Sequence, residues 1–126
     1  MLLIKTYLDK SPIQGVGVFA NEFVKKGTPV WKFNPLIDII LIPEQLVELP
    51  EATREFIDSV AISYPYGSDN FCLSVDNANY MNHSDAPNVS SDTEPNIALR
   101  DIPKGTELTV DYYKEDHRTD ESECQV

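Results

Sequence analysis

The chain has 126 residues and a formal net charge of −11, with 21 acidic residues against 10 basic ones. This length fits one domain, which can bury roughly two-thirds of its unfolded surface. The acidity argues against nucleic acid as a direct ligand and favours a basic partner that approaches by electrostatic steering. No apolar run has the length of a membrane span, so no membrane contact is expected. The start of the chain lacks a basic leader followed by a long apolar stretch, so we expect a cytoplasmic protein.

Short apolar and β-branched stretches alternate with turns rich in glycine, proline and asparagine, which is typical of a β-rich fold. We expect strands, in chain order, over residues 2–8, 17–20, 29–33, 37–42, 71–75, 89–91, 97–99 and 107–110. The run 37–42, Ile-Asp-Ile-Ile-Leu-Ile, is most simply a buried strand. Trp31 is most simply a core residue.

One region is helical in pattern, with a short helix over 43–49 and a second over 50–60. In the second, apolar residues at Ala52, Phe56 and Val60 recur every four positions, and Ile57 joins them. This spacing predicts an amphipathic helix with those residues facing the protein. The fold class is therefore β-dominated α+β with one short helical insert. Residues 1–116 form the domain, and the acidic tail 117–126 is expected to be disordered.

The stretch from residue 80 to 88 reads Tyr-Met-Asn-His-Ser-Asp-Ala-Pro-Asn and fits neither a helix period nor a strand period. It predicts irregular backbone. Apolar residues lead into it, so it can run through the interior, where its peptide groups need partners. Asn82, His83, Ser84 and Asn88 could supply them locally. The alternative is a surface turn with one ordinary histidine.

Three stretches together resemble the SET domain of protein-lysine methyltransferases. They are Gly15-Val16-Gly17, then Asn82-His83-Ser84 with Pro87 and Asn88, then Gly105 with Glu107, Leu108, Thr109, Asp111 and Tyr112. They match the family's G-x-G, N-H-S-C-x-P-N and G-E-E-L-T-x-D-Y stretches, and the resemblance covers about residues 3–115. It implies small curled, β-clip-like sheets and a pseudoknot, in which the N-H-S segment passes under a loop of the segment after it.

The resemblance also implies methyl transfer from S-adenosylmethionine to lysine. Tyr112 would be the catalytic residue, with its hydroxyl orienting the amine and the sulfonium. The residues implied at the cofactor are Gly15, Val16, Gly17, Asn82, His83 and Tyr112. Such a displacement needs aligned reactants and a neutral amine, which costs about 4–5 kcal/mol to form from lysine at pH 7. A narrow apolar channel lowers that cost by desolvation.

Candidates for the substrate channel are Tyr64, Tyr66, Val110 and Tyr113. Adenine packing is the alternative for the tyrosines, and core packing is the simpler assignment for Phe71. Val110 stands two residues before Tyr112, where an aromatic residue in the family often influences how many methyl groups are added. A valine there leaves the degree of methylation open.

No metal site is expected. Cys72 and Cys124 lie far apart and outside any C-x-x-C, which predicts two free thiols. They and His117 do not give His83 partners at metal-binding spacing. A structural histidine remains an alternative for His83.

The sequence departs from the family at several points. Asp85 stands where many relatives have cysteine, and Asn79 where arginine is common. No C-x-C-x-x-x-x-C follows Tyr112, so the zinc-binding post-SET segment that helps to close the channel is missing. The tail, residues 113–116 or a second subunit would have to replace it, which makes a homodimer one hypothesis. The chain looks like a minimal SET domain of the viral, bacterial or archaeal kind.

Three hypotheses follow. The first is an S-adenosylmethionine-dependent protein-lysine N-methyltransferase acting on a basic protein segment, located at nucleoid or host chromatin if that substrate is a chromatin protein. The second is a catalytically silent acidic module that binds lysine-rich tails. The third is an unrelated small ligand-binding domain whose motifs are accidental, which requires two coincidences and ranks last.

Overall fold

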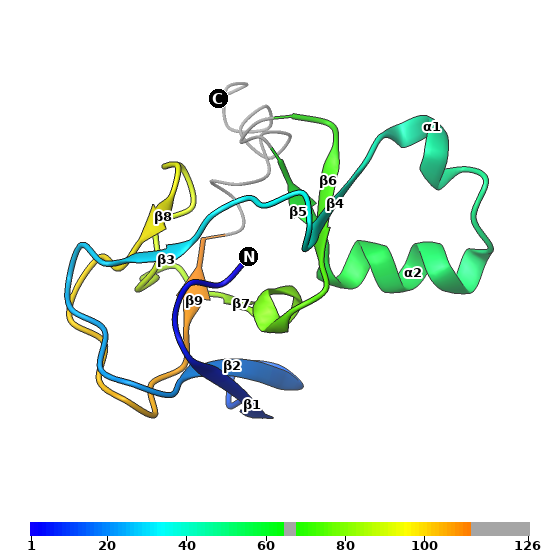
Figure 1. The fold of residues 1–126 in the computed structure, drawn as a ribbon. Helices are drawn as coiled ribbons and strands as arrows, with labels where there is room; N and C mark the ends of the chain where they lie inside the picture. The colour runs from blue at the N-terminus through cyan, green and yellow to red at the C-terminus, as the bar shows by residue number, and fades with distance from the viewer. Residues whose placement is uncertain (65–67, 112–126) are drawn as a thin grey trace, which may run out of the picture.

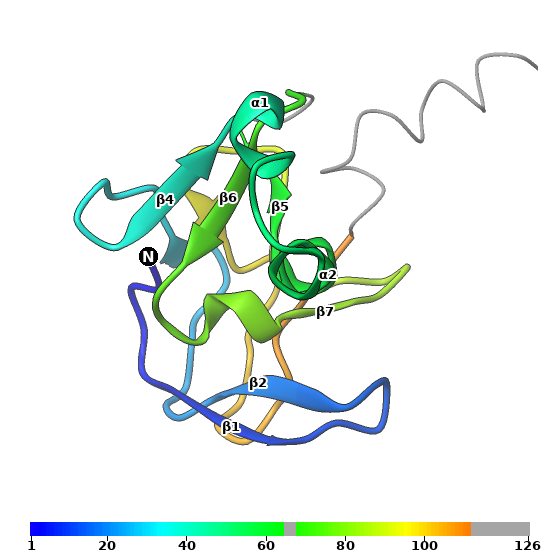
Figure 2. The same cartoon turned by 90° about the vertical axis from the view of Figure 1, so that its right-hand side faces the viewer.

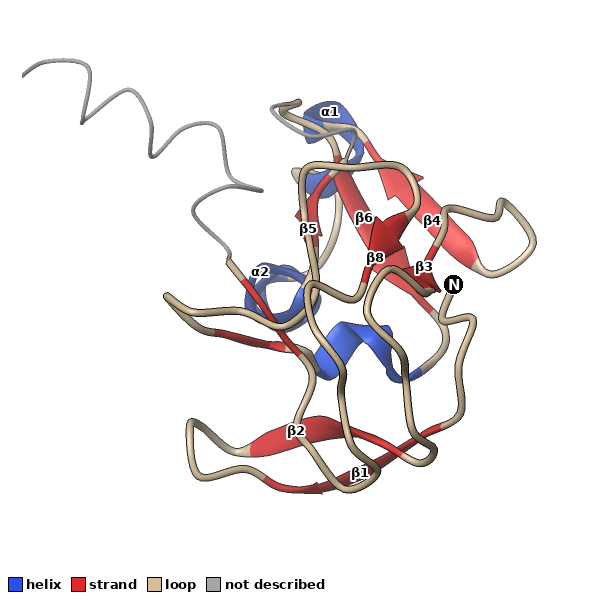
Figure 3. Ribbon diagram, turned by 90° about the vertical axis from the view of Figure 1, so that its left-hand side faces the viewer, coloured by secondary structure: helices blue, strands red, loops and turns tan. Residues whose placement is uncertain are grey.

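The computed structural model describes residues 1–64 and 68–111, and within them short strands form several small sheets (Figure 1). Much of the chain between the strands is irregular (Figure 3). The strands are β1 (Thr6–Lys10), β2 (Val16–Ala20), β3 (Pro29–Trp31), β4 (Asp38–Leu41), β5 (Ile62–Ser63), β6 (Phe71–Ser74), β7 (Asn82–His83), β8 (Asn96–Ile97) and β9 (Thr109–Val110). The predicted β-dominated α+β class with small sheets is confirmed.

β1 and β2 form an antiparallel hairpin in register from Thr6↔Ala20 to Lys10↔Val16. β1 runs on to Lys10, beyond the strand predicted over residues 2–8, because β2 pairs with its whole length. The connecting loop closes where the Ser11 N–H donates to the Gly15 carbonyl at 2.8 Å. Gly15 has φ +49°, a left-handed conformation that favours glycine.

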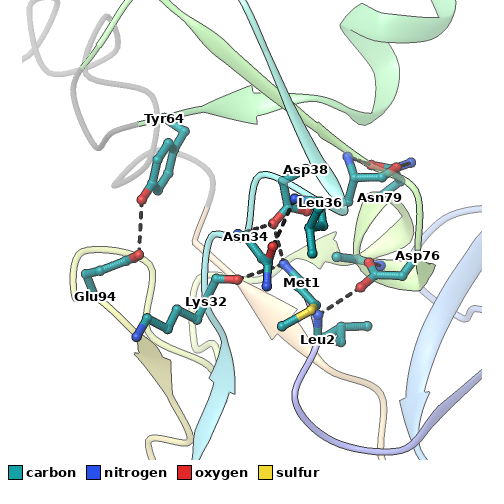
Figure 4. Close-up of polar contacts among 12 residues, drawn as sticks. Met1, Leu2, Lys32, Asn34, Leu36, Asp38, Tyr64, Asp76, Asn79 and Glu94 are labelled. Carbon is teal, nitrogen blue, oxygen red and sulfur yellow. Dashed lines mark hydrogen bonds and ion pairs between the residues drawn. The ribbon is translucent and has the colours of Figure 1, made fainter.

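β4, β6 and β5 form a three-stranded sheet in that order, which corrects the prediction of a buried strand over 37–42. Asp38 is 3% exposed whereas Ile39 is 47% exposed. Successive side chains of a strand point to opposite faces of the sheet, so Asp38 and Ile39 lie on opposite faces, and the face that carries Ile39 is exposed to solvent. The buried Asp38 is satisfied by three donors. The Met1 amine at 2.7 Å and the Asn34 N–H at 2.8 Å are drawn in Figure 4, and the Ser74 hydroxyl donates at 2.7 Å.

The helices α1 (Pro43–Leu46) and α2 (Glu51–Val60) project to one side, with the end of α2 nearest to the sheet (Figures 1 and 2). Of the four apolar residues predicted to face the protein, only Ile57 is buried, and Phe56 is 47% exposed. The buried stripe is narrower than predicted because α2 extends away from the body of the fold. No helix in the described part of the chain is long and apolar enough to cross a membrane.

The main core lies among β2, β3, β9 and the segments that join them. Its buried members are Val18, Ala20, Val24, Val30, Met81, Val89, Ala98, Ile102, Leu108 and Val110. Trp31 is buried as predicted. Residues 89–91 were predicted as a strand but contribute only an isolated bridge, Val89↔Ala98. That bridge and the burial of Val89 hold residues 89–91 in place, although they form no continuous run of strand pairing.

The short strand β5 and the 3-10 helix η1 (Asn77–Tyr80) are among the elements that were not predicted. Asp76 caps η1, because its carboxylate accepts from the Ala78 N–H at 3.0 Å. An acidic residue before Asn-Ala-Asn is a capping signal that the sequence does contain. β5 has only two residues, too few for a sequence pattern.

Candidate functional site

The stretch from residue 80 to 88 pairs with the last strand of the described chain. β7 runs parallel to β9, with Asn82 opposite Thr109 and His83 opposite Val110. The Ser84 N–H continues the pairing to the Val110 carbonyl at 3.0 Å. The stretch was predicted as irregular throughout, and this two-residue strand corrects that. Its partner is distant in sequence, so no local pattern indicates it.

The side chain of Asn88 stabilises the pairing of β7 with β9 from within the core. Its amide nitrogen donates to the Glu107 carbonyl at 2.8 Å, and its amide oxygen accepts from the Thr109 N–H at 2.9 Å. Asn88 is 5% exposed. The amide thus satisfies buried backbone groups, as expected, but on a segment 19–21 residues away. The threading of a pseudoknot goes beyond these contacts and stays a prediction.

The Asn82 side chain meets the glycine-containing loop between β1 and β2. Its amide nitrogen lies 3.2 Å from the Gln14 carbonyl oxygen and 3.3 Å from the Val16 carbonyl oxygen. These partners are 68 and 66 residues away in sequence. The structure therefore brings together residues 15–17 and Asn82, which the sequence analysis assigned to one cofactor site.

A carboxylate lies at the same place. Glu107 Oε2 accepts from the Asn82 amide at 2.8 Å, and the Ser11 hydroxyl lies 2.9 Å from both Glu107 oxygens. Gly17 makes this possible, because a Cβ atom there would overlap Glu107 Oε2. Neither Ser11 nor Glu107 was assigned to the site from sequence. Glu107 belongs to a matched motif, whereas Ser11 carries no signal beyond that of a turn residue.

His83 lies beside two acidic residues. Its Nε2 is 2.9 Å from Asp85 Oδ1, and its Nδ1 is 3.8 Å from Asp111 Oδ1. Its side chain is 25% exposed. Among the residues described, no group of three histidine, cysteine, aspartate or glutamate side chains could hold a metal ion.

A largely apolar cavity with a volume of about 30 Å³ has Met81, which precedes β7, and Val110 of β9 in its wall. Its lining residues are Trp31, Val60, Ile62, Cys72, Ser74, Ala78, Asn79, Met81, Asn96 and Val110. Val110, predicted for the substrate channel, is therefore in the wall, and it pairs with His83. Burial raises the pKa of the Cys72 thiol to about 12, and the nearby Asp38 adds to the shift.

Tyr64 is not among the lining residues of this cavity. Its ring stacks on Phe33 with centroids 5.0 Å apart and meets Trp31, which does line the cavity, edge-on at 5.7 Å. Its hydroxyl donates to Glu94 at 3.0 Å (Figure 4). Burial, and then Glu94, raises the pKa of Tyr64 to about 12. The other predicted aromatic residues, Tyr66, Tyr112 and Tyr113, and the tail lie outside the described residues.

Comparison with known proteins matches residues 15–113 to the family model of the SET domain. Over 114 residues the chain is 34% identical to histone-lysine N-methyltransferase 2D of Homo sapiens and, equally, of Mus musculus. The match takes in 84% of this chain and 2% of each relative, so the chain spans only a small part of these curated relatives.

Two solved structures have a similar fold. One is a Plasmodium falciparum protein provisionally described as a histone methyltransferase, with 25% identity and a TM-score of 0.59 over 88% of this chain and 95% of that one. The other is a humanized mutant of the Chaetomium thermophilum Polycomb Repressive Complex 2 bound to an inhibitor. It has a TM-score of 0.61 and 19% identity over 90% of this chain and 15% of that one, which is a likeness of fold.

Proposed function

The chain belongs to the SET-domain family, and from that premise we propose that it is an S-adenosylmethionine-dependent protein-lysine N-methyltransferase. The observation that carries this proposal is the meeting of Asn82 with the loop around residues 15–17. These are the positions that the family resemblance assigns to the cofactor, and they come together from distant parts of the chain.

The groups at this point fit a cationic cofactor. S-adenosylmethionine supplies a methyl group on a positively charged sulfonium and carries an ammonium group. The site offers the carbonyl oxygens of Gln14 and Val16 and the carboxylate of Glu107, all of which are hydrogen-bond acceptors. Asn82 and the loop would bind the cofactor here, and the backbone of His83 follows directly in β7.

The apolar cavity supports an amine as the methyl acceptor. Val110 and Met81 in its wall cannot solvate an ammonium ion, so the amine of a lysine side chain brought against this apolar wall would lose its proton more readily. The net charge of −11 would draw a lysine-rich segment toward the protein at low salt. We therefore propose a basic protein tail as the substrate.

The test is calorimetric titration of S-adenosylmethionine into the wild type and into Asn82→Ala, with Asn21→Ala as a control because Asn21 is exposed. We expect saturable binding to the wild type and the control, and binding that is about a hundredfold weaker but still measurable in Asn82→Ala. Mass spectrometry of basic peptides incubated with protein and cofactor should then show added methyl groups. No binding by the wild type would overturn the proposal for this chain on its own.

The second candidate is a silent acidic module, favoured by the net charge of −11 and by Asp85 in place of a cysteine. It predicts that lysine-rich peptides bind without cofactor, that binding weakens with added salt, and that no methyl group is transferred. A homodimer would supply a second chain to complete the channel. Sedimentation of the intact protein tests for that dimer.

A further inference from the structure

We propose that Glu107 is a positioning residue that fixes the orientation of the Asn82 amide and, through Ser11, the position of the loop before β2. This proposal rests on the function proposed above, because it concerns the same cofactor site. It adds that a carboxylate outside the assigned cofactor residues decides which atom Asn82 presents to a ligand.

The argument begins with the Asn82 amide nitrogen. Four acceptors lie within 3.3 Å of it: Glu107 Oε2 at 2.8 Å, the Ser11 hydroxyl at 3.1 Å, and the carbonyls of Gln14 and Val16. An amide nitrogen has two hydrogens and an amide oxygen has none. The nitrogen end must therefore face this group of acceptors. The shortest of these contacts is to the only charged partner, Glu107, and hydrogen bonds to charged groups are the stronger ones.

The other end of the amide follows from this. Asn82 Oδ1 accepts no hydrogen bond from the residues that the structure describes. It is the end left to accept a hydrogen bond from a ligand. If the amide were flipped, its oxygen would face the Glu107 carboxylate, and two acceptors would meet without a proton between them. The flipped amide would also offer the ligand a donor in place of an acceptor.

Ser11 links the same carboxylate to the loop. Its hydroxyl has one proton, which faces Glu107 at 2.9 Å, so its oxygen accepts from the loop. The Ile13 N–H donates to that oxygen at 2.9 Å and the Gln14 N–H at 3.4 Å. Glu107 thus orders the Ser11 hydroxyl, and the ordered hydroxyl holds the backbone of the loop.

The informative substitution is Glu107→Gln, which keeps the size of the side chain and replaces one acceptor with a donor. The Ser11 hydroxyl lies 2.9 Å from both Glu107 oxygens, so a glutamine whose carbonyl oxygen takes the Oε2 place can still accept from Ser11 and Asn82. What the substitution removes is the charge, and a neutral acceptor holds a donor less strongly than a carboxylate does. We therefore expect the Asn82 amide to lose part of its order. The matched control is Glu22→Gln, because within the described part of the chain the carboxylate of the half-buried Glu22 accepts a backbone N–H, from Lys5 at 2.8 Å, and no side-chain donor.

The first measurement needs no cofactor. In ¹⁵N-labelled protein, the side-chain amide signals of Asn82 are identified by their disappearance in Asn82→Ala. We expect these signals to move in Glu107→Gln and to stay in place in Glu22→Gln. Unmoved signals in a folded Glu107→Gln would overturn the proposal. If Glu107→Gln does not fold, Glu107→Asp, which keeps the charge but is one methylene shorter, should move the same signals.

The second measurement uses S-adenosylmethionine and a double-mutant cycle. We expect Glu107→Gln to weaken binding about tenfold, and to weaken it no further once Asn82 is already alanine. Losses that simply add would show that Glu107 acts independently of Asn82 and would overturn the proposal. Absence of binding by the wild type would overturn the proposed function instead, and the amide signals would still decide the role of Glu107.

Discussion

The carboxylate of Glu107 fills the space in which a side chain at Gly17 would begin. A Cβ atom built on Gly17 would overlap Oε2 and lie 2.8 Å from Cδ of Glu107. The glycine at residue 17 is therefore required by a neighbour from a distant part of the chain. Its partner in the motif, Gly15, has open space around it and is required for its φ of +49°.

The two glycines should respond differently to alanine. Gly15→Ala should cost about 1 kcal/mol through left-handed backbone strain, whereas Gly17→Ala should cost about 1–3 kcal/mol through overlap. Glu107→Ala vacates the space and should recover part of the loss from Gly17→Ala, but none of the loss from Gly15→Ala. Urea unfolding of the wild type, the three single variants and the two double variants measures this. Equal recovery for both glycines would contradict the geometry.

Asn88→Ala should destabilise the fold by about 2–4 kcal/mol. The substitution leaves the Thr109 N–H and the Glu107 carbonyl without their partner in a buried place. Asn21→Ala, at an exposed position, should stay within about 0.5 kcal/mol of the wild type. Urea unfolding checks both, and a small effect at Asn88 would show that other contacts hold the β7–β9 pairing.

Tyr112→Phe should abolish methyl transfer and leave the fold intact. Its hydroxyl is expected to orient the reacting groups, and loss of such a group costs about a hundredfold or more in rate. Tyr7→Phe is the control, because Tyr7 lies in β1 with its ring stacked on Phe19. The readouts are methyl groups counted by mass spectrometry and the free energy of unfolding. Full activity in Tyr112→Phe would overturn the assigned role.

Stability should fall at high pH because of Cys72. Its thiol pKa is raised from 9.0 to about 12 in the folded protein, so the unfolded chain loses this proton first. The stabilising contribution is complete below pH 9 and declines as the pH rises toward 12. Cys72→Ala should flatten this decline in urea unfolding at several pH values. The same decline in wild type and Cys72→Ala would contradict the shift.

Tyr64 titrates in the same direction, with a pKa raised from 10.0 to about 12. Its contribution begins to decline only above pH 10, one unit later than that of Cys72. Tyr64→Phe therefore separates the contributions of the two residues to the pH dependence of stability. A slope between pH 9 and 10 that persists in Tyr64→Phe belongs to Cys72.

Local patterns determined most of the secondary structure. The helices near 43–60 and the strands around 17–20, 29–33, 37–42 and 71–75 were predicted because their periodicity and turn residues are contained within a few positions. What failed was burial: Asp38 is inside and Ile39 outside. A run of apolar residues does not tell whether its strand lies at the centre or the edge of a sheet.

The sequence by itself determined the family, through motifs whose residues stand in fixed order, and with it the assignment of residues 15–17, Asn82 and His83 to one site. Only the tertiary structure decided how those residues are held. The partners of Asn82 lie between 25 and 71 residues away, and a hydrogen bond over such a separation leaves no periodic trace in the sequence. The roles of Ser11 and Glu107 became visible for that reason only when the chain was folded.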